Sequence, residues 1–483
     1  MLSCTKYSEN NLKRPVMSKD LSKVFKAYDI RGLSPEELNG EFAKRLGLSI
    51  AAHFKPKRVL VGRDMRTTSP VLESMLIQGL TESGVDVVRI GLCSTPMFYN
   101  LTGLAQSLEP FDLGVMVTAS HNPGIYNGLK IIHGDCLPVG QGNDMEELRD
   151  AFQRGDQIKA DHPGTAVDEP GSLDKYIELV IRSAKLPSDM PQFKVAIDAG
   201  NGMAGSVLPR LLERLPWLEA LPMYFIPDGT FPNHEANPLK IENLKELIAK
   251  VKQEKCHLGV SFDGDADRVG FIDENGEPIP GDLMTAFLAQ EILKGHPGGK
   301  VLIDIRASWA AQEAVKEAGG VFEFSRVGHA LIKKQMRETG AVFAGEISMH
   351  MYFHELWNCE CSDLAMLLVL RRMATTGQTL SELIRPLLRY KNSGEINFKL
   401  SAKAEAIKAL SEKYSAQASF KSELDGVRLE FRDKTNPQED WWFNVRASNT
   451  EPLLRLVVEA KTDEVLSRRT AELKEFLAAY VGA

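Results

Sequence analysis

Two short polar loops, far apart in the sequence, carry the residue types best suited to catalysis. The first contains Ser120 within residues 118–123, directly after an apolar run at 113–117 that predicts a buried strand. Asn, Pro and Gly follow, so the serine hydroxyl is expected on a tight turn at the strand end. A serine hydroxyl is a weak nucleophile until a base or a cation activates it, and His121 and Lys130 are close in sequence. A single Ser-His pair is nevertheless more often a polar turn than a catalytic site.

The second loop places three carboxylates at alternate positions, Asp263, Asp265 and Asp267, and ends in Arg268. Hard divalent cations take oxygen ligands, and Mg²⁺ typically pairs a few carboxylates with a phosphate oxygen. The small residues between the aspartates let one turn surround a single ion. A calcium loop of the helix-loop-helix type would end in a glutamate that this segment lacks, and a plain Asp-rich turn is the remaining alternative.

Together, the two loops resemble the phosphoserine loop and the metal loop of the α-D-phosphohexomutase family, most closely its phosphomannomutase/phosphoglucomutase branch. Residues 345–350 are similar to the sugar-recognition loop of that family, and residues 446–452 to its phosphate-binding loop. Further segments match in the family's order, at residues 25–32, 62–64, 94–96, 198–202 and 327–329. The resemblance covers the chain from about Phe25 to the C-terminus, and four loops in order are far more specific than any one of them.

The resemblance implies a distinct role for the serine and aspartate loops. Ser120 would carry the phosphate, and one Mg²⁺ per chain would be held by a phosphoserine oxygen together with Asp263, Asp265 and Asp267. Arg268 would neutralise charge beside the cation, since the transferred group carries about −2 at neutral pH. Hexose 1,6-bisphosphate is implied as activator and intermediate.

Substrate recognition is implied for the other two loops and for one further arginine. Glu346 and Ser348 are similar to the pair that reads O3 and O4 of the sugar, contacts that do not distinguish glucose from mannose at O2. The remaining residues expected to bind substrate are His350, Arg306, Arg446, Ser448, Asn449 and Thr450. An arginine can bind phosphate through two parallel hydrogen bonds, and hydroxyl and amide groups add neutral donors.

Proton transfer needs a base at the attacking sugar hydroxyl and an acid at the departing oxygen. The resemblance implies four polar candidates, Arg31, Lys130, His329 and His350. We favour Lys130 as the base, with a pKa lowered by Arg31 and the metal, although the sequence alone leaves this choice open.

Three positions depart from the family's pattern. Met349 stands where the sugar loop commonly has glycine, and Arg306 stands where related enzymes often have lysine, so the preference for glucose or mannose stays open. Residues 361–363 replace an Asp-Asp-Gly run, and Ser362 is expected to cap the helix that follows. None of these departures falls within the sequence of the serine or aspartate loop.

The implied activity is the reversible interconversion of hexose 1-phosphate and hexose 6-phosphate, of mannose or glucose, through a phosphoserine enzyme and a hexose 1,6-bisphosphate. Phosphoglucosamine mutase, which shares the serine and aspartate loops, is one alternative. A metal-dependent sugar-phosphate phosphatase would release phosphate without needing a bisphosphate, and a sugar-phosphate sensor would have lost turnover. The intact Ser120 and the three aspartates argue against the sensor.

Composition argues against several other classes of protein. The 483 residues carry a formal net charge of −7, which offers no basic surface for nucleic acid and no polybasic membrane patch. The sequence contains no run of about 18 apolar residues, so we expect no membrane span. Residues 1–20 lack the apolar core of a signal peptide. The six cysteines are therefore expected as free thiols in the reducing cytoplasm. We expect a monomer whose partners are small sugar phosphates.

Strand and helix patterns alternate from residue 58 to residue 344, which predicts α/β units with buried sheets. Strands are expected at 58–61, 86–90, 113–117, 194–198, 221–226, 258–262, 269–272, 301–305, 321–324 and 341–344. Helices are expected at 70–83, 145–154, 173–184, 203–215, 242–254, 282–293, 307–318 and 330–338. Near the C-terminus, strands at 396–400, 426–431, 441–446 and 453–460 mix with helices at 402–414 and 464–480, an α+β pattern.

The predicted fold is therefore of the α/β class, with several domains around one central cleft. Three similar α/β domains with mixed sheets are expected at 21–165, 166–275 and 276–390, followed by a C-terminal α+β domain at 391–483. Residues 1–20 are expected to form a flexible extension, and the Pro/Gly/Asp-rich stretch at 155–171 a linker.

Overall fold

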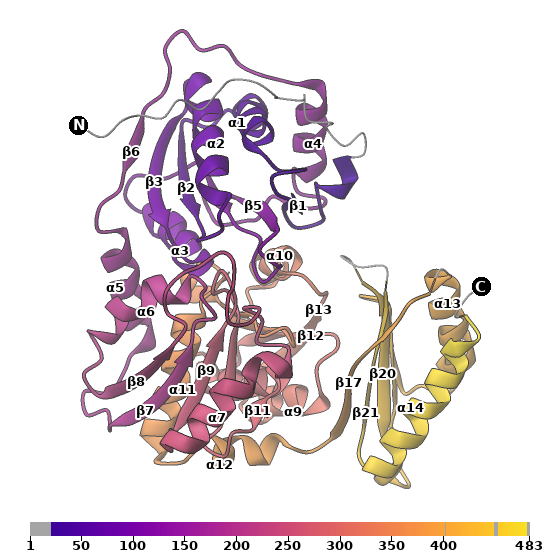
Figure 1. Ribbon diagram of the computed structural model, residues 1–483. Coiled ribbons are helices and arrows are strands. Elements are labelled where there is room, and N and C mark those ends of the chain that lie inside the picture. Colours follow the sequence, from indigo (N-terminus) through magenta and orange to yellow (C-terminus); the bar gives the residue numbers. More distant parts are fainter. Residues whose placement is uncertain (1–20, 401, 449–452, 481–483) are drawn as a thin grey trace.

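The computed structural model describes residues 21–400, 402–448 and 453–480, which form four sheets with helices packed against them (Figure 1). Three mixed α/β domains followed by a C-terminal α+β domain were predicted, and this architecture is confirmed. The expected N-terminal extension, residues 1–20, lies outside the described residues. No helix in the described part of the chain is long and apolar enough to cross a membrane.

The first sheet carries the serine loop. Its strand order is β1-β5-β4-β2-β3-β6, with β5 antiparallel to β1 and β4 and the other pairs parallel. The strands are β1 (Ile30–Leu33), β2 (Arg58–Arg63), β3 (Asp86–Leu92), β4 (Leu113–Val117), β5 (Tyr126–His133) and β6 (Ala166–Asp168). β4 is buried along its whole length, so the chain leaves the sheet core just before Ser120. β6 lies in the stretch expected to be a linker and adds an edge strand to this sheet.

Helices α1 (Gly40–Phe54) and α2 (Ser69–Glu82) pack tightly through two glycines. A Cβ atom on Gly47 would lie 2.4 Å from the carbonyl oxygen of Leu76, and one on Gly79 would lie 2.2 Å from that of Lys44. Two more helices complete this domain, α3 (Thr95–Ala105) and α4 (Met145–Arg154). Ser94 caps α3 by accepting a hydrogen bond from the Met97 amide.

The second and third sheets also mix parallel and antiparallel pairs. Their orders are β11-β10-β9-β7-β8 and β13-β12-β14-β15-β16. The second sheet comprises β7 (Phe193–Asp198), β8 (Leu218–Met223), β9 (Leu258–Phe262), β10 (Val269–Ile272) and β11 (Pro278–Ile279). The third comprises β12 (Lys300–Asp304), β13 (Val321–Ser325), β14 (Phe343–Gly345), β15 (Met351–Phe353) and β16 (Cys359–Glu360). The expected bounds 221–226 of one strand are wrong, because β8 pairs with β7 from Leu218 onward and ends with it.

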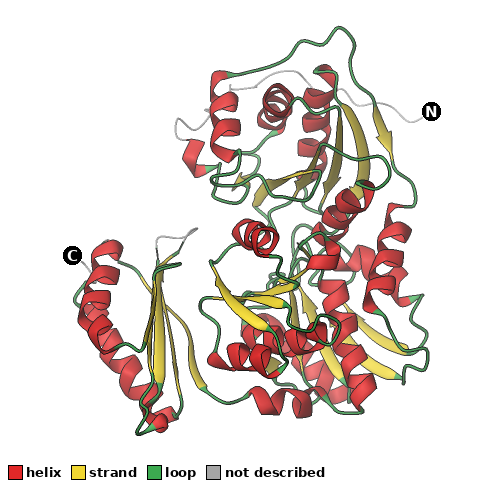
Figure 2. Cartoon of the chain, turned by 180° about the vertical axis from the view of Figure 1, so that it is seen from behind, coloured by secondary structure: helices red, strands yellow, loops and turns green. Residues whose placement is uncertain are grey.

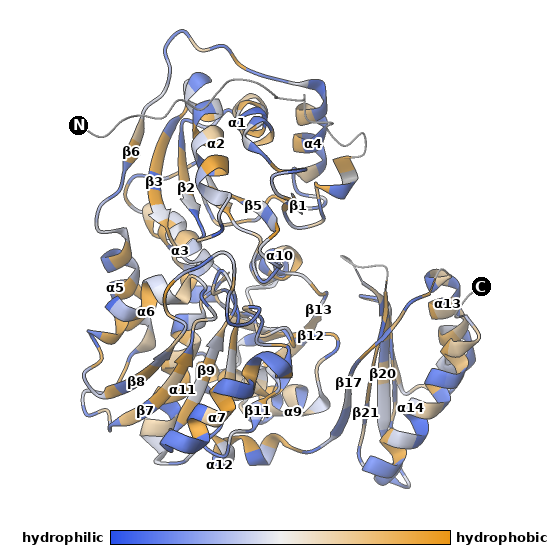
Figure 3. Cartoon of the chain, in the orientation of Figure 1, coloured by the Kyte–Doolittle hydropathy of each residue, from blue (hydrophilic) through white to orange (hydrophobic). Residues whose placement is uncertain are grey.

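Most helices of these two domains share one hydrophobic core with residues of the first domain, whereas Lys245–Glu254 and His329–Thr339 pack into smaller clusters. They are α5 (Ser172–Ala184), α6 (Ala204–Leu212), α7 (Lys245–Glu254), α8 (Gly281–Leu293), α9 (Trp309–Glu317), α10 (His329–Thr339), α11 (Ser362–Thr376) and α12 (Leu380–Ile384). A continuous apolar cluster runs from Phe98 in α3 through Phe262 in β9 to Leu367 in α11. The surface helix α7, in contrast, is coloured largely as hydrophilic in Figure 3.

The C-terminal domain is an antiparallel sheet with two helices on its outer side (Figures 1 and 2). The sheet order is β17-β21-β20-β19-β18. Its elements are β17 (Lys391–Phe398), α13 (Lys403–Tyr414), β18 (Phe420–Ser422), β19 (Val427–Phe431), β20 (Trp441–Ala447), β21 (Leu454–Ala460) and α14 (Asp463–Ala478). This domain has a hydrophobic cluster of its own, which includes Leu429, Phe443 and Leu473.

A buried arginine docks the C-terminal domain onto the third domain. Arg428 in β19 is fully buried and donates to the carbonyl oxygens of Ile305 at 2.6 Å and Ala307 at 2.9 Å. Its guanidinium also pairs with Glu430 at 2.7 Å and lies 3.7 Å from the centre of a Trp442 ring. Burying a charged group is costly unless it is paired and hydrogen-bonded, and here both conditions are met.

We predict that Arg428→Met loosens the C-terminal domain, because it leaves two buried carbonyls without a donor at about 1–3 kcal/mol each. The melting temperature should fall, and proteolysis should become faster in the connecting segment 388–395. Small-angle scattering should show a larger radius of gyration. Lys421→Met, at an exposed position of the same domain, is the matched control. If Arg428→Met and Lys421→Met have the same radius of gyration and the same melting temperature, this role of Arg428 is contradicted.

Candidate active site

Ser120 occupies the turn after β4 in a backbone conformation that a serine rarely adopts. Its φ is +52°, in the left-handed region, and only 4% of its surface is exposed. The Ser120 hydroxyl donates to Asp263 Oδ2 at 3.2 Å and lies 3.1 Å from His121 Nδ1. The structure thus places the serine loop of the first domain directly against the aspartate loop of the second, 143 residues later.

The two loops approach closely because position 264 has no side chain. A Cβ atom on Gly264 would lie 2.4 Å from the carbonyl oxygen of Ser120. Ala266, two residues on, has φ +61°, and its carbonyl accepts a hydrogen bond from the Ser362 hydroxyl. The expected role of Ser362 as a helix cap is therefore wrong. The N-cap of α11 is Cys361 without a side-chain cap, because the serine hydroxyl is bonded to the aspartate loop.

The three aspartates of this loop form a buried acidic cluster. One carboxylate oxygen of each lies within 4.8 Å of the others. Asp265 Oδ2 accepts from the Thr95 hydroxyl at 2.6 Å and from Lys130 Nζ at 2.7 Å, whereas Asp265 Oδ1 has no hydrogen-bond donor among the described residues. Burial and the two neighbouring carboxylates raise the pKa of Asp263 well above its ordinary value. An unpartnered buried oxygen in a crowded acidic cluster fits a hard divalent cation, held by Asp263, Asp265 and Asp267.

Lys130, in β5, is buried between two of these carboxylates. Its Nζ lies 2.7 Å from Asp265 Oδ2 and 2.6 Å from Asp267 Oδ2. Burial alone would lower the pKa of Lys130, but the two carboxylates outweigh it and raise this pKa well above its ordinary value. The lowered pKa expected from the sequence assumed a bound cation beside Lys130 and Arg31; the aspartates by themselves raise this pKa instead.

The expected sugar-recognition loop joins the aspartate loop through His350. His350 Nε2 lies 3.2 Å from Asp267 Oδ1, and His350 Nδ1 lies 3.0 Å from Glu346 Oε2. Burial alone would lower the pKa of His350, but these carboxylates raise it to about 9. Burial alone would raise the pKa of Glu346, but the hydrogen bond from His350 contributes to lowering it to about 2. Arg268 also contacts His350, with Nε 3.2 Å from Nε2.

Two departures from the family's pattern have structural consequences in the third domain. Met349 has φ +70°, in the left-handed region that favours glycine, so the glycine common at this position has a backbone reason. Ser348 beside it has its hydroxyl 3.0 Å from His350 Nδ1. Arg306 donates to Asp304 Oδ1 at 2.9 Å and reaches Glu395 of the C-terminal domain at 3.3 Å. The Arg306 guanidinium is thus held by carboxylates of two domains.

The expected phosphate-binding loop begins at the end of β20 with a buried arginine. Arg446 Nε donates to Asp425 Oδ1 at 3.0 Å, and Asp425 Oδ2 accepts from the Val327 amide of the third domain at 2.9 Å. Arg446 Nη2 has no hydrogen-bond partner in the described part of the chain. Ser448 is described, whereas Asn449 and Thr450 lie outside the described residues.

The two remaining predicted residues are Arg31, beside the serine loop, and His329, at the start of a helix of the third domain. Arg31 Nη1 donates to Asn122 Oδ1 at 2.8 Å, and the Arg31 guanidinium also pairs with Asp29. His329 begins α10, and its ring packs edge-on against Tyr28 with centroids 5.7 Å apart. His329 Nδ1 has no partner within the described ranges, and burial lowers the pKa of His329 well below its ordinary value.

Two residues for which no role was predicted connect the domains at this site. The Thr95 amide and hydroxyl both bond to Asp265, at 2.9 Å and 2.6 Å. Asp425 bridges the third domain and Arg446. The signals were present but weak, because Thr95 lies in a matched three-residue segment at a helix start and Asp425 in an ordinary Asp-Gly turn.

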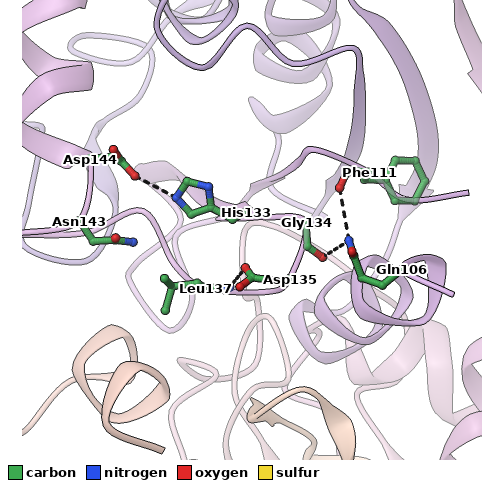
Figure 4. A pocket seen from close by; sticks show the side chains of 8 residues that line it. All are labelled: Gln106, Phe111, His133, Gly134, Asp135, Leu137, Asn143 and Asp144. Atoms are coloured by element: carbon green, nitrogen blue, oxygen red, sulfur yellow. Dashed lines mark hydrogen bonds and ion pairs between the residues drawn. The ribbon is translucent and has the colours of Figure 1, made fainter. Parts of the chain in front are cut away.

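A separate pocket of about 490 Å³ lies in the first domain (Figure 4). It is lined by Gln106, Phe111, His133, Gly134, Asp135, Leu137, Asn143 and Asp144. Its polar side chains bond to one another or to nearby backbone, as in the 3.0 Å contact between His133 Nε2 and Asp144 Oδ2. None of the predicted site residues lines this pocket, so we do not assign the chemistry to it.

Comparison with known proteins decides the family. The models of the phosphoglucomutase/phosphomannomutase alpha/beta/alpha domains I, II and III match residues 22–159, 174–276 and 280–390, and the model of the C-terminal domain matches residues 395–476. The chain belongs to the phosphoglucomutase/phosphomannomutase family. The prediction made from the four loops is thereby confirmed.

Relatives within this family match over nearly their whole length. A protein of Xanthomonas campestris named phosphohexose mutases is 37% identical over 461 residues, covering 94% of this chain and 99% of that protein. The phosphomannomutase of Methanocaldococcus jannaschii is 37% identical over 457 residues, covering 94% and 97%. A crystal structure of a phosphoglucomutase/phosphomannomutase family protein from Burkholderia thailandensis aligns with a TM-score of 0.85 at 30% identity, covering 95% of this chain and 98% of that one.

We predict that Gly264→Ala lowers mutase turnover by about 100-fold, because the new methyl group meets the Ser120 carbonyl and shifts the reacting atoms. Gly295→Ala is the matched control, since the nearest atom to its added Cβ is 3.7 Å away. Steady-state kinetics and thermal melting of both variants provide the comparison. Equal turnover in the two variants would show that the close approach of the loops has no catalytic importance.

Proposed function

We propose that this chain interconverts hexose 1-phosphate and hexose 6-phosphate, of glucose or mannose, with Ser120 as the phosphate carrier. The observation that carries the proposal is the Ser120 hydroxyl, buried against the acidic cluster and bonded to Asp263. Relatives named phosphomannomutase and phosphohexose mutases support this class of substrate. Solved structures of N-acetylglucosamine-phosphate mutases are similar to this chain in fold alone, at 12–14% identity. They therefore do not favour the alternative that the chain is a phosphoglucosamine mutase.

In the proposed reaction, phospho-Ser120 donates its phosphoryl group to the free hydroxyl of a hexose monophosphate. The bond between phosphorus and the serine oxygen breaks as the bond to the sugar oxygen forms, and the sugar hydroxyl loses its proton. The hexose 1,6-bisphosphate then turns round, and its other phosphate returns to Ser120. Such transfers depend mainly on positioning and on neutralising charge, which suits a serine held on a rigid turn among buried cations.

Recognition of the sugar and of its second phosphate is assigned to the third and fourth domains. Glu346, Ser348 and His350 are proposed to bind the sugar hydroxyls, because they lie together beside Asp267. Arg446 is proposed to bind the distal phosphate through its unpartnered Nη2. Arg306, Ser448, Asn449 and Thr450 complete the proposed set.

One Mg²⁺ per chain is proposed at Asp263, Asp265 and Asp267, together with a phosphoserine oxygen. When bound, this ion supplies charge neutralisation for the transferred group. The chain's own cations around the aspartates include Lys130, His350 and Arg268, the last with Nε 3.8 Å from Asp263 Oδ2. They balance part of the buried negative charge.

Four groups remain the proposed candidates for proton transfer, Arg31, Lys130, His329 and His350. His329 is the best suited to accept a proton, because burial favours its neutral ring and its Nδ1 is unpartnered within the described residues. Neighbouring carboxylates raise the pKa values of Lys130 and His350, so both groups stay protonated and are suited to hydrogen-bond charged oxygens rather than to accept the proton. A monomeric state and a cytoplasmic location stay predictions.

We predict that the purified protein carries phosphate on Ser120 and converts glucose 1-phosphate and mannose 1-phosphate when primed with the bisphosphate. Peptide mass spectrometry should find the phosphate on Ser120 and not in Ser120→Ala, which should have no measurable turnover. Ser107→Ala, at an exposed serine of the same domain, is the control. Phosphate found only elsewhere, or full turnover by Ser120→Ala, would exclude the carrier role; release of free phosphate instead of an isomer would indicate a phosphatase.

Removal of the cation or of one ligand should stop turnover while the fold persists. Asp265→Asn is expected to lower turnover by about 10²–10³-fold, as typical for loss of one group that stabilises transition-state charge. It should also weaken Mg²⁺ binding measured by calorimetry. Asp174→Asn, at an exposed position of α5, is the control. Full turnover in excess EDTA would refute the metal site, and restored turnover on adding Mg²⁺ would support it.

A further inference from the structure

Arg66 has no role in the site described so far, yet its side chain contacts the serine loop at four points. Only 1% of its surface is exposed. Arg66 Nη2 donates to the carbonyl oxygen of Ser120 at 2.9 Å and to that of Asn122 at 2.6 Å. Arg66 Nη1 donates to the carbonyl oxygens of Pro123 and Tyr126, each at 2.9 Å. One guanidinium thus satisfies the backbone of the loop from the serine to the start of β5.

Those carbonyl groups converge on one side because the loop turns back on itself. Ser120, with φ +52°, reverses the direction of the chain at its centre. A non-glycine residue persists in this conformation only where its surroundings impose it. The carbonyl of Ser120 is also the atom against which Gly264 packs. Arg66 therefore acts on the peptide group that sets the direction of the Ser120 hydroxyl.

The guanidinium is itself held in place from two sides. Asp64 accepts from Arg66 Nε at 3.1 Å and from the Arg66 amide at 3.0 Å, and Ser69 donates to Asp64 at 2.6 Å. From the second domain, the Phe231 ring lies 5.3 Å from the guanidinium carbon, and Gly229 packs so closely that a Cβ atom would lie 2.5 Å from the Arg66 Cα. The side chain is enclosed, so it provides a fixed template for the loop.

We propose that Arg66 is a positioning residue for phosphoryl transfer at Ser120. Its four donor contacts hold the serine loop in the one backbone conformation that directs the Ser120 hydroxyl at the aspartate cluster. The inference rests on the proposed role of Ser120 as phosphate carrier. Arg66 acts through the backbone and does not contact the sugar-recognition residues, so its loss should slow transfer without weakening the binding of the hexose phosphate.

The geometry requires an arginine rather than any cation. A guanidinium presents five N–H donors in a fixed plane, whereas a lysine ammonium is a compact charge with three donors. Lysine at position 66 would keep the charge beside Asp64 but could not reach four carbonyl groups and the carboxylate at once. Arg66→Lys therefore separates positioning from charge.

The experiment compares Arg66→Lys and Arg66→Ala with Arg63→Lys, a control in the same segment whose side chain pairs with Glu73 outside the loop. The enzymes carry a radiolabelled phosphate on Ser120 and are mixed with glucose 1-phosphate, and transfer of the label to sugar phosphate is followed in a single turnover; steady-state assays give KM. We expect Arg66→Lys to transfer about 100-fold more slowly, with an unchanged KM and a normal circular dichroism spectrum. Arg63→Lys should behave as the natural protein. Added guanidinium chloride at millimolar concentration should partly restore transfer in Arg66→Ala.

The outcomes separate this proposal from the proposed function. If the natural protein carries no phosphate on Ser120, the proposed function fails and the role of Arg66 fails with it. If the natural protein transfers phosphate and Arg66→Lys transfers at the same rate, only the positioning role is overturned. If KM of Arg66→Lys rises by the same factor as its kcat falls, the positioning role is also overturned. The same holds if Arg66→Ala unfolds and is not rescued by guanidinium while Arg66→Lys keeps full activity.

Discussion

The buried negative charge of the aspartate loop is the constraint around which the first three domains are arranged. Three carboxylates this close repel one another strongly where water is excluded, so each needs a cation or a donor. The first domain supplies Lys130 and Thr95, and the third supplies His350. Removing one partner of a buried ion pair typically costs about 3–5 kcal/mol. The residues proposed to handle phosphate therefore also hold the first three domains together.

A chain of contacts continues from this cluster to the C-terminal domain. His350 connects Asp267 to Glu346, and Glu346 accepts from the Gly328 amide at 3.2 Å. The neighbouring Val327 amide is held by Asp425, which also holds Arg446. Every link is short and most are buried. The separation between Ser120 and Arg446 is thus set by hydrogen bonds rather than by loop length.

Sequence patterns predicted most elements but not the environment of each side chain. The expected ranges 113–117 and 258–262 match β4 and β9 residue for residue, because short apolar runs between turns leave little choice. Helix α3 was not predicted, since it is buried on nearly all sides and shows no polar face. A helix was expected after residue 362, but the length of α11 was not predicted. The raised pKa of Lys130 could not be foreseen, because its partners lie 135 and 137 residues away.

Four of the hydrogen bonds that dock the C-terminal domain are made to backbone atoms of the third domain. Arg428 binds two carbonyl groups, Asp425 binds the Val327 amide, and Glu459 accepts from the Trp309 amide at 2.9 Å. A carbonyl group is present whatever amino acid occupies the position, and an amide is lost only with proline. The C-terminal domain therefore recognises the path of the neighbouring chain as well as side chains such as Arg306, Trp309 and Phe324. A substitution in the third domain that removes one of these side-chain contacts leaves the backbone half of the interface in place.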